Sequence, residues 1–136
     1  MASEIAARED LLPAADLAHL RLRELRFQAQ PDGNMVDLII FDYPLPAGFD
    51  YASADLLIQL PMGWPDAKAD MWYFDPWLRI SRTGAYPPAA EVPGDIAGRR
   101  WQRWSRHFPQ ANWKAGTDSL ASYLALVDRE LAKAIA

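Results

Sequence analysis

The 136-residue sequence contains no cysteine, no long apolar run and no secretory leader pattern. Without cysteine the chain has no disulfide, no thiolate metal ligand and no thiol nucleophile. No apolar run reaches the roughly 18 residues of a membrane-spanning helix. The N-terminus has an acid, Glu4, and no apolar core segment, so it is unlike a signal peptide. These absences predict a cytoplasmic protein with no membrane partner.

Motifs for phosphate and metal binding are also missing. Neither GxxxxGK[ST] nor GxGxxG occurs, so nucleotide binding has no support. Asp66, Asp70 and Asp75 are candidate metal ligands, but they surround a strand and its entry turn, where solvated carboxylates are the commoner case. We therefore expect neither a metal nor a cofactor.

Charge is distributed unevenly along the chain. The segment between Ile96 and Thr117 has no acid, and it holds Arg99, Arg100, Arg103, Arg106, Lys114 and His107. Its formal charge is +5, so the remaining residues carry −9, since the whole chain carries −4. Three of the six tryptophans, Trp101, Trp104 and Trp113, fall in the same segment. This basic-aromatic segment is the first candidate for a binding site.

Periodicity predicts an α+β fold in a single domain, residues 1–136. Helical composition covers Ser3–Leu12 and Ala14–Leu22, with Pro13 in the first turn of the second helix. A turn at Pro31–Asn34 joins the first two strands of an antiparallel meander. We predict its strands, about four in number, over Leu25–Gln30, Met35–Tyr43, Ala54–Leu60 and Asp70–Asp75.

The second half is predicted to be irregular until its last element. The domain divides into a helical segment (1–22), the meander (23–77), an irregular segment (78–116) and a C-terminal helix (117–135). Prolines and glycines interrupt residues 78–116, and long loops of this kind tend to be functional. Thr117 is the predicted cap of the last helix, whose apolar stripe is Leu120, Tyr123, Leu124, Val127 and Leu131.

Several phrases of the sequence resemble the ubiquitin-conjugating enzyme (E2) superfamily, and more closely prokaryotic E2 family E. Trp64-Pro65 stands at the tyrosine-proline place that follows the third strand of E2 proteins, and Trp113 at their later tryptophan. The matching phrases span roughly Leu22 to Leu131, most of the chain. They are Asp55-Leu56-Leu57-Ile58, Leu60-Pro61, Trp64-Pro65-Asp66-Ala67, Ala69-Asp70-Met71-Trp72, Gly98-Arg99 and Trp101-Gln102-Arg103-Trp104-Ser105-Arg106-His107. The resemblance implies an E2/UBC-like fold.

The sequence departs from the E2 pattern at the catalytic position. In many E2 enzymes the thioester-forming cysteine lies eight residues before the later tryptophan, and here that place is Ser105. The histidine-proline-asparagine signature, whose asparagine supports the oxyanion, is missing too, because neither His19 nor His107 is followed by it. The resemblance therefore implies a pseudo-E2, for which thioester transfer is not available.

Two interpretations of Ser105 remain. It could carry a ubiquitin-like protein as an oxyester with His107 as base, because residues two apart on a strand share a face. Alternatively, Ser105 and His107 are a vestigial site. The second interpretation is favoured, since no nearby acid is available to orient the histidine.

The basic-aromatic segment has three interpretations. It could be a protein interface, for which tryptophan and arginine are favoured anchors. It could anchor the irregular loop, with tryptophans on the sheet and arginines reaching outward. Nucleic-acid binding is the least favoured, given the acidic remainder of the chain. The leading prediction assigns partner binding to Arg99, Arg100, Trp101, Arg103, Trp104, Arg106, Trp113 and Lys114.

The resemblance also implies a function. The expected protein is a binding or scaffold component of a bacterial ubiquitin-like conjugation pathway, and not itself an enzyme. Its implied partners are an E1-like activating enzyme and a ubiquitin-like or multi-ubiquitin-like protein. Relatives occur beside genes for such proteins and for metalloprotease-type deconjugases, in systems associated with defence against phage. The alternatives are the Ser105 oxyester transferase and a nucleic-acid-binding module.

Overall fold

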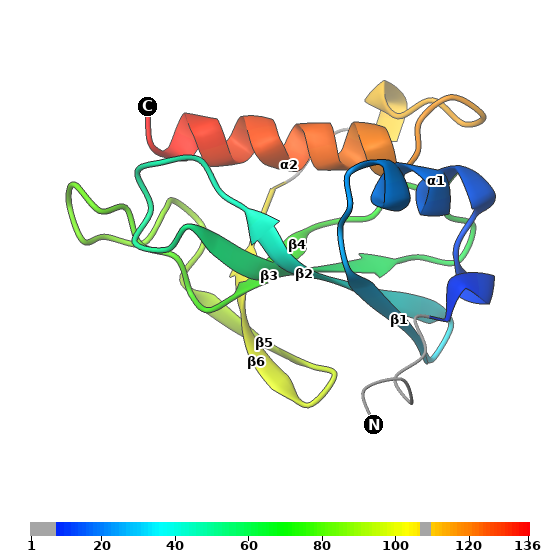
Figure 1. The fold of residues 1–136 in the computed structure, drawn as a ribbon, viewed down its shortest axis with the longest axis horizontal. Coiled ribbons are helices and arrows are strands. Elements are labelled where there is room, and N and C mark those ends of the chain that lie inside the picture. Colours follow the sequence, from blue (N-terminus) through cyan, green and yellow to red (C-terminus); the bar gives the residue numbers. More distant parts are fainter. Residues whose placement is uncertain (1–7, 107–109) are drawn as a thin grey trace.

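The computed structural model describes residues 8–106 and 110–136, and within them the protein is an α+β structure (Figure 1). One antiparallel sheet lies beneath two helices. The elements are α1 (Ala14–Leu22), β1 (Phe27–Asp32), β2 (Met35–Pro44), β3 (Ser53–Leu60), β4 (Trp72–Asp75), β5 (Val92–Ile96), β6 (Arg99–Trp104) and α2 (Leu120–Ala134). Among the described residues, no helix combines the length and apolar character that crossing a bilayer requires.

The N-terminal half follows the predicted order closely. The helix predicted over Ser3–Leu12 lies partly outside the described residues, and its described part forms only a short 3₁₀-helix at Glu9–Leu11. The hairpin turn is shorter than predicted, because Pro31 and Asp32 continue β1 and pair with β2. Proline is tolerated there because β1 is an edge strand, where a residue without an N–H need not cost an inter-strand hydrogen bond.

The sheet has six strands, not about four, in the order β1-β2-β3-β4-β6-β5. The two additional strands form a hairpin inside the segment predicted to be irregular. Its turn consists of Ala97 and Gly98, both with positive φ (52° and 74°), which is the geometry of a tight two-residue hairpin. The second strand of this hairpin, β6, pairs with β4 and so joins the basic-aromatic segment to the meander.

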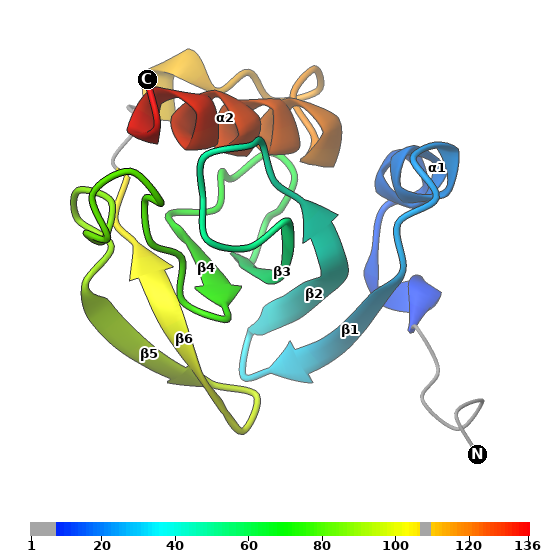
Figure 2. The ribbon, with the colours of Figure 1, turned by 60° about the vertical axis from the view of Figure 1, so that its left-hand side comes forward.

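Both helices lie on the same side of the sheet (Figure 2). All five residues of the predicted stripe of α2 are buried in the main core: Leu120, Tyr123, Leu124, Val127 and Leu131. The helix begins later than predicted, because Ser119 caps it in a capping box with Ser122, in place of Thr117. The stripe is thus confirmed and the cap is corrected.

A buried carboxylate on α1 ties the two helices to the loop after β3. The Asp16 side chain is 1% exposed, and its Oδ1 accepts the backbone N–H of Leu120, the first residue of α2, at 3.1 Å. Its Oδ2 accepts Nε1–H of Trp64 at 2.8 Å. An acid at a helix N-terminus satisfies a free N–H and interacts favourably with the helix dipole. One side chain therefore joins three separate segments.

The sheet face turned away from the helices carries a second, smaller apolar cluster. Its buried members are Ile39, Leu57, Tyr73 and Trp101, one from each of four neighbouring strands. Side chains alternate along a strand, so these residues point away from Trp72 and Phe74, which face the main core. Two arginines of the predicted site lie at this cluster, Arg99 over the Trp101 ring and Arg103 beside Tyr73.

Candidate functional site

The three tryptophans of the basic-aromatic segment are core residues. Trp101 and Trp104 are fully buried and Trp113 is 8% exposed. Trp104 stacks on Trp72 with ring centroids 6.3 Å apart, and its Nε1–H donates to Gln102. Such tryptophans stabilise the fold and offer no ring surface to a partner in this conformation. The geometry agrees with the interpretation in which they anchor the segment, so any part they play in partner binding is indirect.

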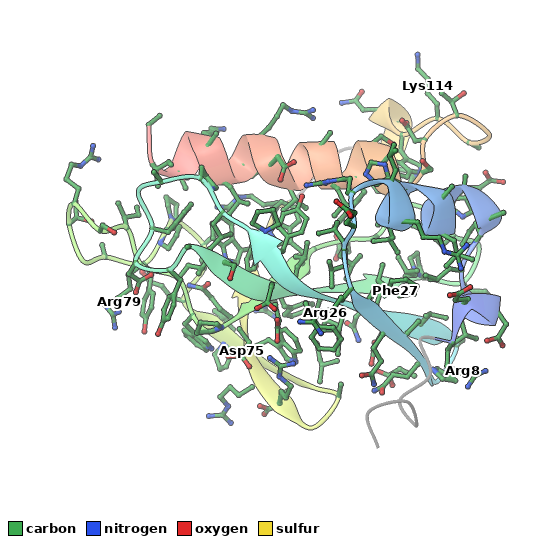
Figure 3. All side chains as sticks on the ribbon, in the orientation of Figure 1. Arg8, Arg26, Phe27, Asp75, Arg79 and Lys114 are labelled. Atoms are coloured by element: carbon green, nitrogen blue, oxygen red, sulfur yellow. The ribbon has the colours of Figure 1, made fainter. Side chains whose placement is uncertain are left out.

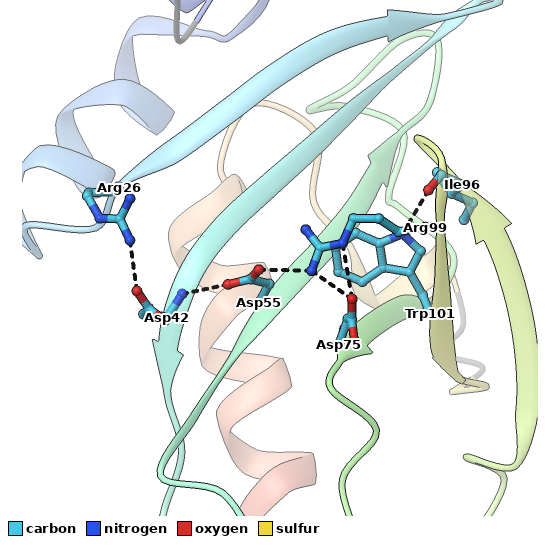
Figure 4. A network of polar contacts seen from close by, with 7 residues as sticks. All are labelled: Arg26, Asp42, Asp55, Asp75, Ile96, Arg99 and Trp101. Carbon is cyan, nitrogen blue, oxygen red and sulfur yellow. Dashed lines mark hydrogen bonds and ion pairs between the residues drawn. The ribbon is translucent and has the colours of Figure 1, made fainter. Parts of the chain in front are cut away.

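Arg99 is held by carboxylates from two other strands (Figure 4). Its guanidinium pairs with Asp55 of β3 at 2.9 Å and with Asp75 of β4 at 2.8 Å. It also lies over the ring of Trp101, 4.2 Å from the centroid. Asp55 in turn accepts the backbone N–H of Asp42. Because these groups are partly buried, the network fixes the end of β6 against the centre of the sheet.

Two further arginines also have carboxylate partners. Arg100 pairs with Asp95 across the β5–β6 hairpin, and both side chains are largely exposed. Arg106 pairs with Glu130 of α2 at 2.8 Å, and these side chains are only 13% and 17% exposed. Arg106 also lies over the Trp104 ring. The Arg106–Glu130 pair lines a cavity of about 310 Å³ at the C-terminal half of α2.

The remaining two cations of the segment have no carboxylate partner among the described residues. Lys114 is exposed and its side chain extends away from the body of the protein (Figure 3). Arg103 is half-buried beside Tyr73, on the sheet face turned away from α2. The five cations of this segment, which follow one another in the sequence without an intervening acid, therefore lie in different surroundings in the fold.

Ser105 follows the last residue of β6 and is half-buried. Its N–H donates to the carbonyl of Ala89 at 3.0 Å, and its own carbonyl accepts from Nη1 of Arg106. His107 lies outside the described residues, so the predicted pairing of the serine with the histidine stays a prediction. The backbone of Ser105 is fixed between the segment before β5 and an arginine that is paired with α2.

The three candidate metal ligands lie in separate places. Asp75 pairs with Arg99, and Asp66 accepts the backbone N–H of Gly116 at 3.1 Å. Asp70 lines a cavity beside Tyr73. Within residues 8–106 and 110–136, no three acidic or histidine side chains are grouped as a metal ion would need. Asp66 thus serves a hydrogen bond and Asp75 an ion pair.

One acid that sequence reasoning missed lies buried on β2. Asp37 is 1% exposed, and its Oδ1 accepts Nε2–H of Gln59 at 3.1 Å. Burial raises its pKa to about 6, and the nearby Asp32 contributes to the same shift. The available signal was an acid between two apolar residues, Val36 and Leu38, in a mostly apolar strand.

The fold and the site together define an α+β protein in which a basic segment is built into an antiparallel sheet. Residues 12–134 match the model of prokaryotic E2 family E, and the chain belongs to this family. It is a bacterial E2-like protein without a cysteine. No curated protein and no solved structure matches the chain. The α+β architecture is consistent with an E2-like fold, although the sheet has two strands more than the sequence predicted.

Proposed function

We propose that this protein is a pseudo-E2 that acts as a binding or scaffold component of a bacterial ubiquitin-like conjugation pathway. One observation carries the proposal: a chain that belongs to an E2 family over residues 12–134 contains no cysteine. Thioester transfer requires a thiolate on the carrier protein, and a serine hydroxyl needs an adjacent base to act as a nucleophile. The partners are an E1-like activating enzyme and a ubiquitin-like or multi-ubiquitin-like protein. The setting is cytoplasmic defence against phage.

Ser105 occupies the vacant catalytic position in this proposal. Its support is the spacing of eight residues before Trp113 and the place of Ser105 directly after β6. A cysteine introduced there should accept the ubiquitin-like protein if the surroundings of an E2 site persist. The test incubates wild type and Ser105→Cys with the E1-like and ubiquitin-like proteins of the same organism and ATP. Ser81→Cys, at an exposed serine in the loop after β4, is the matched control.

Three results are decisive in this assay. The proposal expects a stable complex with wild type but no covalent adduct, and a thiol-sensitive adduct on Ser105→Cys alone. A hydroxide-labile adduct on wild type that is lost in Ser105→Ala would overturn the scaffold role and favour the oxyester transferase. Absence of both complex and adduct would overturn the pathway assignment. For the defence role, deletion of the gene from its native locus should raise the plating efficiency of phage.

The partner surface is proposed to use the exposed cations of the basic-aromatic segment. Lys114 and Arg100 are accessible, and both are suited to an acidic surface, whereas the tryptophans of the segment are buried. Lys114→Glu should weaken the complex about tenfold or more, because it replaces an attraction with a repulsion. Arg82→Glu, at an exposed loop arginine, is the matched control and should bind as wild type does. Equal weakening by both variants would indicate a general charge effect and not this surface.

A further inference from the structure

Arg103 differs from the other arginines of β6 and its neighbourhood. Arg99, Arg100 and Arg106 each pair with a carboxylate, and no carboxylate within the described residues pairs with Arg103. Its Nε is buried and finds no hydrogen-bond acceptor in the same part of the chain. A buried donor without an acceptor is unfavourable, and the penalty disappears when the side chain turns toward an acceptor that a ligand supplies.

The Arg103 side chain borders a cavity of about 280 Å³. The cavity lies on the sheet face turned away from the helices, because it is lined by Tyr73, which points away from the main core. Met35 and Met71 contribute apolar walls to it. Methionine side chains adapt their shape to an apolar group that packs against them. The cavity therefore combines adjustable apolar walls with an arginine that has no counter-ion among residues 8–106 and 110–136.

The charged side chains that line this cavity carry a small positive excess. Arg103 and Lys68 are its cations and Asp70 is its one acid, so the lining has one net positive charge. Two further acids lie behind the lining, because Gln59, which lines the cavity, donates from Nε2 to Asp37 at 3.1 Å and to Asp32 at 3.4 Å. The attraction for an anion is therefore local to Arg103. Arginine presents parallel N–H groups that match the two oxygens of a carboxylate.

We propose that the Arg103 cavity binds the C-terminal carboxylate of a partner peptide whose last residue is apolar. A chain terminus carries its carboxylate and its side chain on the same carbon atom. The two groups can therefore reach Arg103 and the methionine walls together within so small a volume. An acidic side chain offers only short methylene segments beside its carboxylate. The site is distinct from Ser105 and does not rest on the proposed pathway.

Methyl NMR on the purified protein with ¹³C-labelled methionine tests this site directly. The probes are acetyl-Gly-Gly-Gly-Leu with a free carboxylate, the same peptide as a C-terminal amide, and acetyl-Gly-Glu-Gly-Gly amide. The free carboxylate should shift the Met35 and Met71 methyl signals on titration. The amide and the glutamate peptide should bind at least about tenfold more weakly, since each loses one part of the paired recognition.

Variants of Arg103 complete the test. Arg103→Gln should weaken binding of the free carboxylate about tenfold or more, and Arg103→Lys should weaken it less, because charge is kept while the planar fork is lost. Arg82→Gln, at an exposed loop arginine outside both proposed binding surfaces, is the matched control and should bind as wild type does. If Arg103→Gln does not fold, Arg103→Lys and the comparison of the three peptides on wild type still test the carboxylate site. Four results would each overturn the proposal. They are no methyl shift at millimolar peptide, equal binding of the acid and amide peptides, equal binding of the glutamate peptide, and unchanged binding by Arg103→Gln.

Discussion

Replacing Asp37 with asparagine should stabilise this protein at neutral pH. The carboxyl group is 1% exposed and lies opposite Gln59 in the β2–β3 register, with Asp32 close enough to share a hydrogen bond. Burial disfavours its charged form, and the neighbouring acid adds to the effect. Asparagine has the same shape, keeps an oxygen that can accept Nε2–H of Gln59, and gains an amide that can donate to Asp32. It therefore removes the charge and retains the packing.

The magnitude follows from the shift of the Asp37 pKa, from 3.8 to about 6. One pKa unit corresponds to about 1.4 kcal/mol, so the buried charge costs up to about 3 kcal/mol of folding free energy at pH 7. The folded state holds this proton more tightly than the unfolded state. The stability contributed by the neutral form is thus fully present below about pH 4 and lost as the pH rises to about 6.

Urea denaturation of wild type and Asp37→Asn between pH 4 and pH 8 measures this effect as the difference between the two proteins. The difference should approach zero near pH 4, grow through pH 6 and stay constant above it. Asp42→Asn is the control, because Asp42 is on the same strand but exposed. It should change stability by less than about 1 kcal/mol, without the same pH profile. An Asp37→Asn protein that is no more stable than wild type at pH 7, or a difference independent of pH, would refute the reasoning.

Three further substitutions test the packing of the fold by urea denaturation. Gly94→Ala should cost about 1–3 kcal/mol, because a Cβ atom there would lie 2.8 Å from the Tyr73 ring, and an unchanged midpoint would show that the ring moves freely. Arg99→Gln should lower the free energy of unfolding by about 1–3 kcal/mol, because two partly buried aspartates lose their cation. If Arg99→Lys were as stable as wild type, the planar guanidinium would not matter for this network. Asp16→Ala removes two buried hydrogen bonds and should cost about 2–4 kcal/mol, whereas Asp10→Ala, at an exposed residue, should cost almost nothing.

The sequence predicts the elements whose periodicity is uninterrupted. Ala14–Leu22 is the helix as predicted, and β2, β3 and β4 differ from their predicted ranges by at most two residues at either end. The β5–β6 hairpin escapes prediction because β5 contains Pro93 and Gly94, which are poor strand formers. Tertiary context explains both residues: β5 is an edge strand, and the Tyr73 ring leaves no room for a side chain at position 94.

The sequence shows the charges and aromatic residues of the candidate site but not their contacts, and the role of the site in partner binding stays a prediction. The basic-aromatic segment joins the sheet through β6, and burial removes its tryptophans from the surface. The carboxylates that pair with Arg99, Arg100 and Arg106 come from other strands or from α2, and local sequence gives no sign of them. The unpaired state of Arg103 is likewise visible only once β6 is placed beside β4.

The pairing of these arginines has a consequence for the kinetics of association. A segment with five positive charges and no negative charge would, if fully exposed, attract an acidic partner over a Debye length, which is about 8 Å at physiological salt. In the folded protein three of its five cations face carboxylates at 3.0 Å or less, so their fields largely cancel at a distance. Encounter with an acidic partner should therefore gain little from electrostatic steering, and its association rate constant should change only weakly with ionic strength. The positive charge of this segment acts mainly at contact distance, within its own sheet and at Arg103 and Lys114, which pair with no carboxylate in the part of the chain that the structure describes.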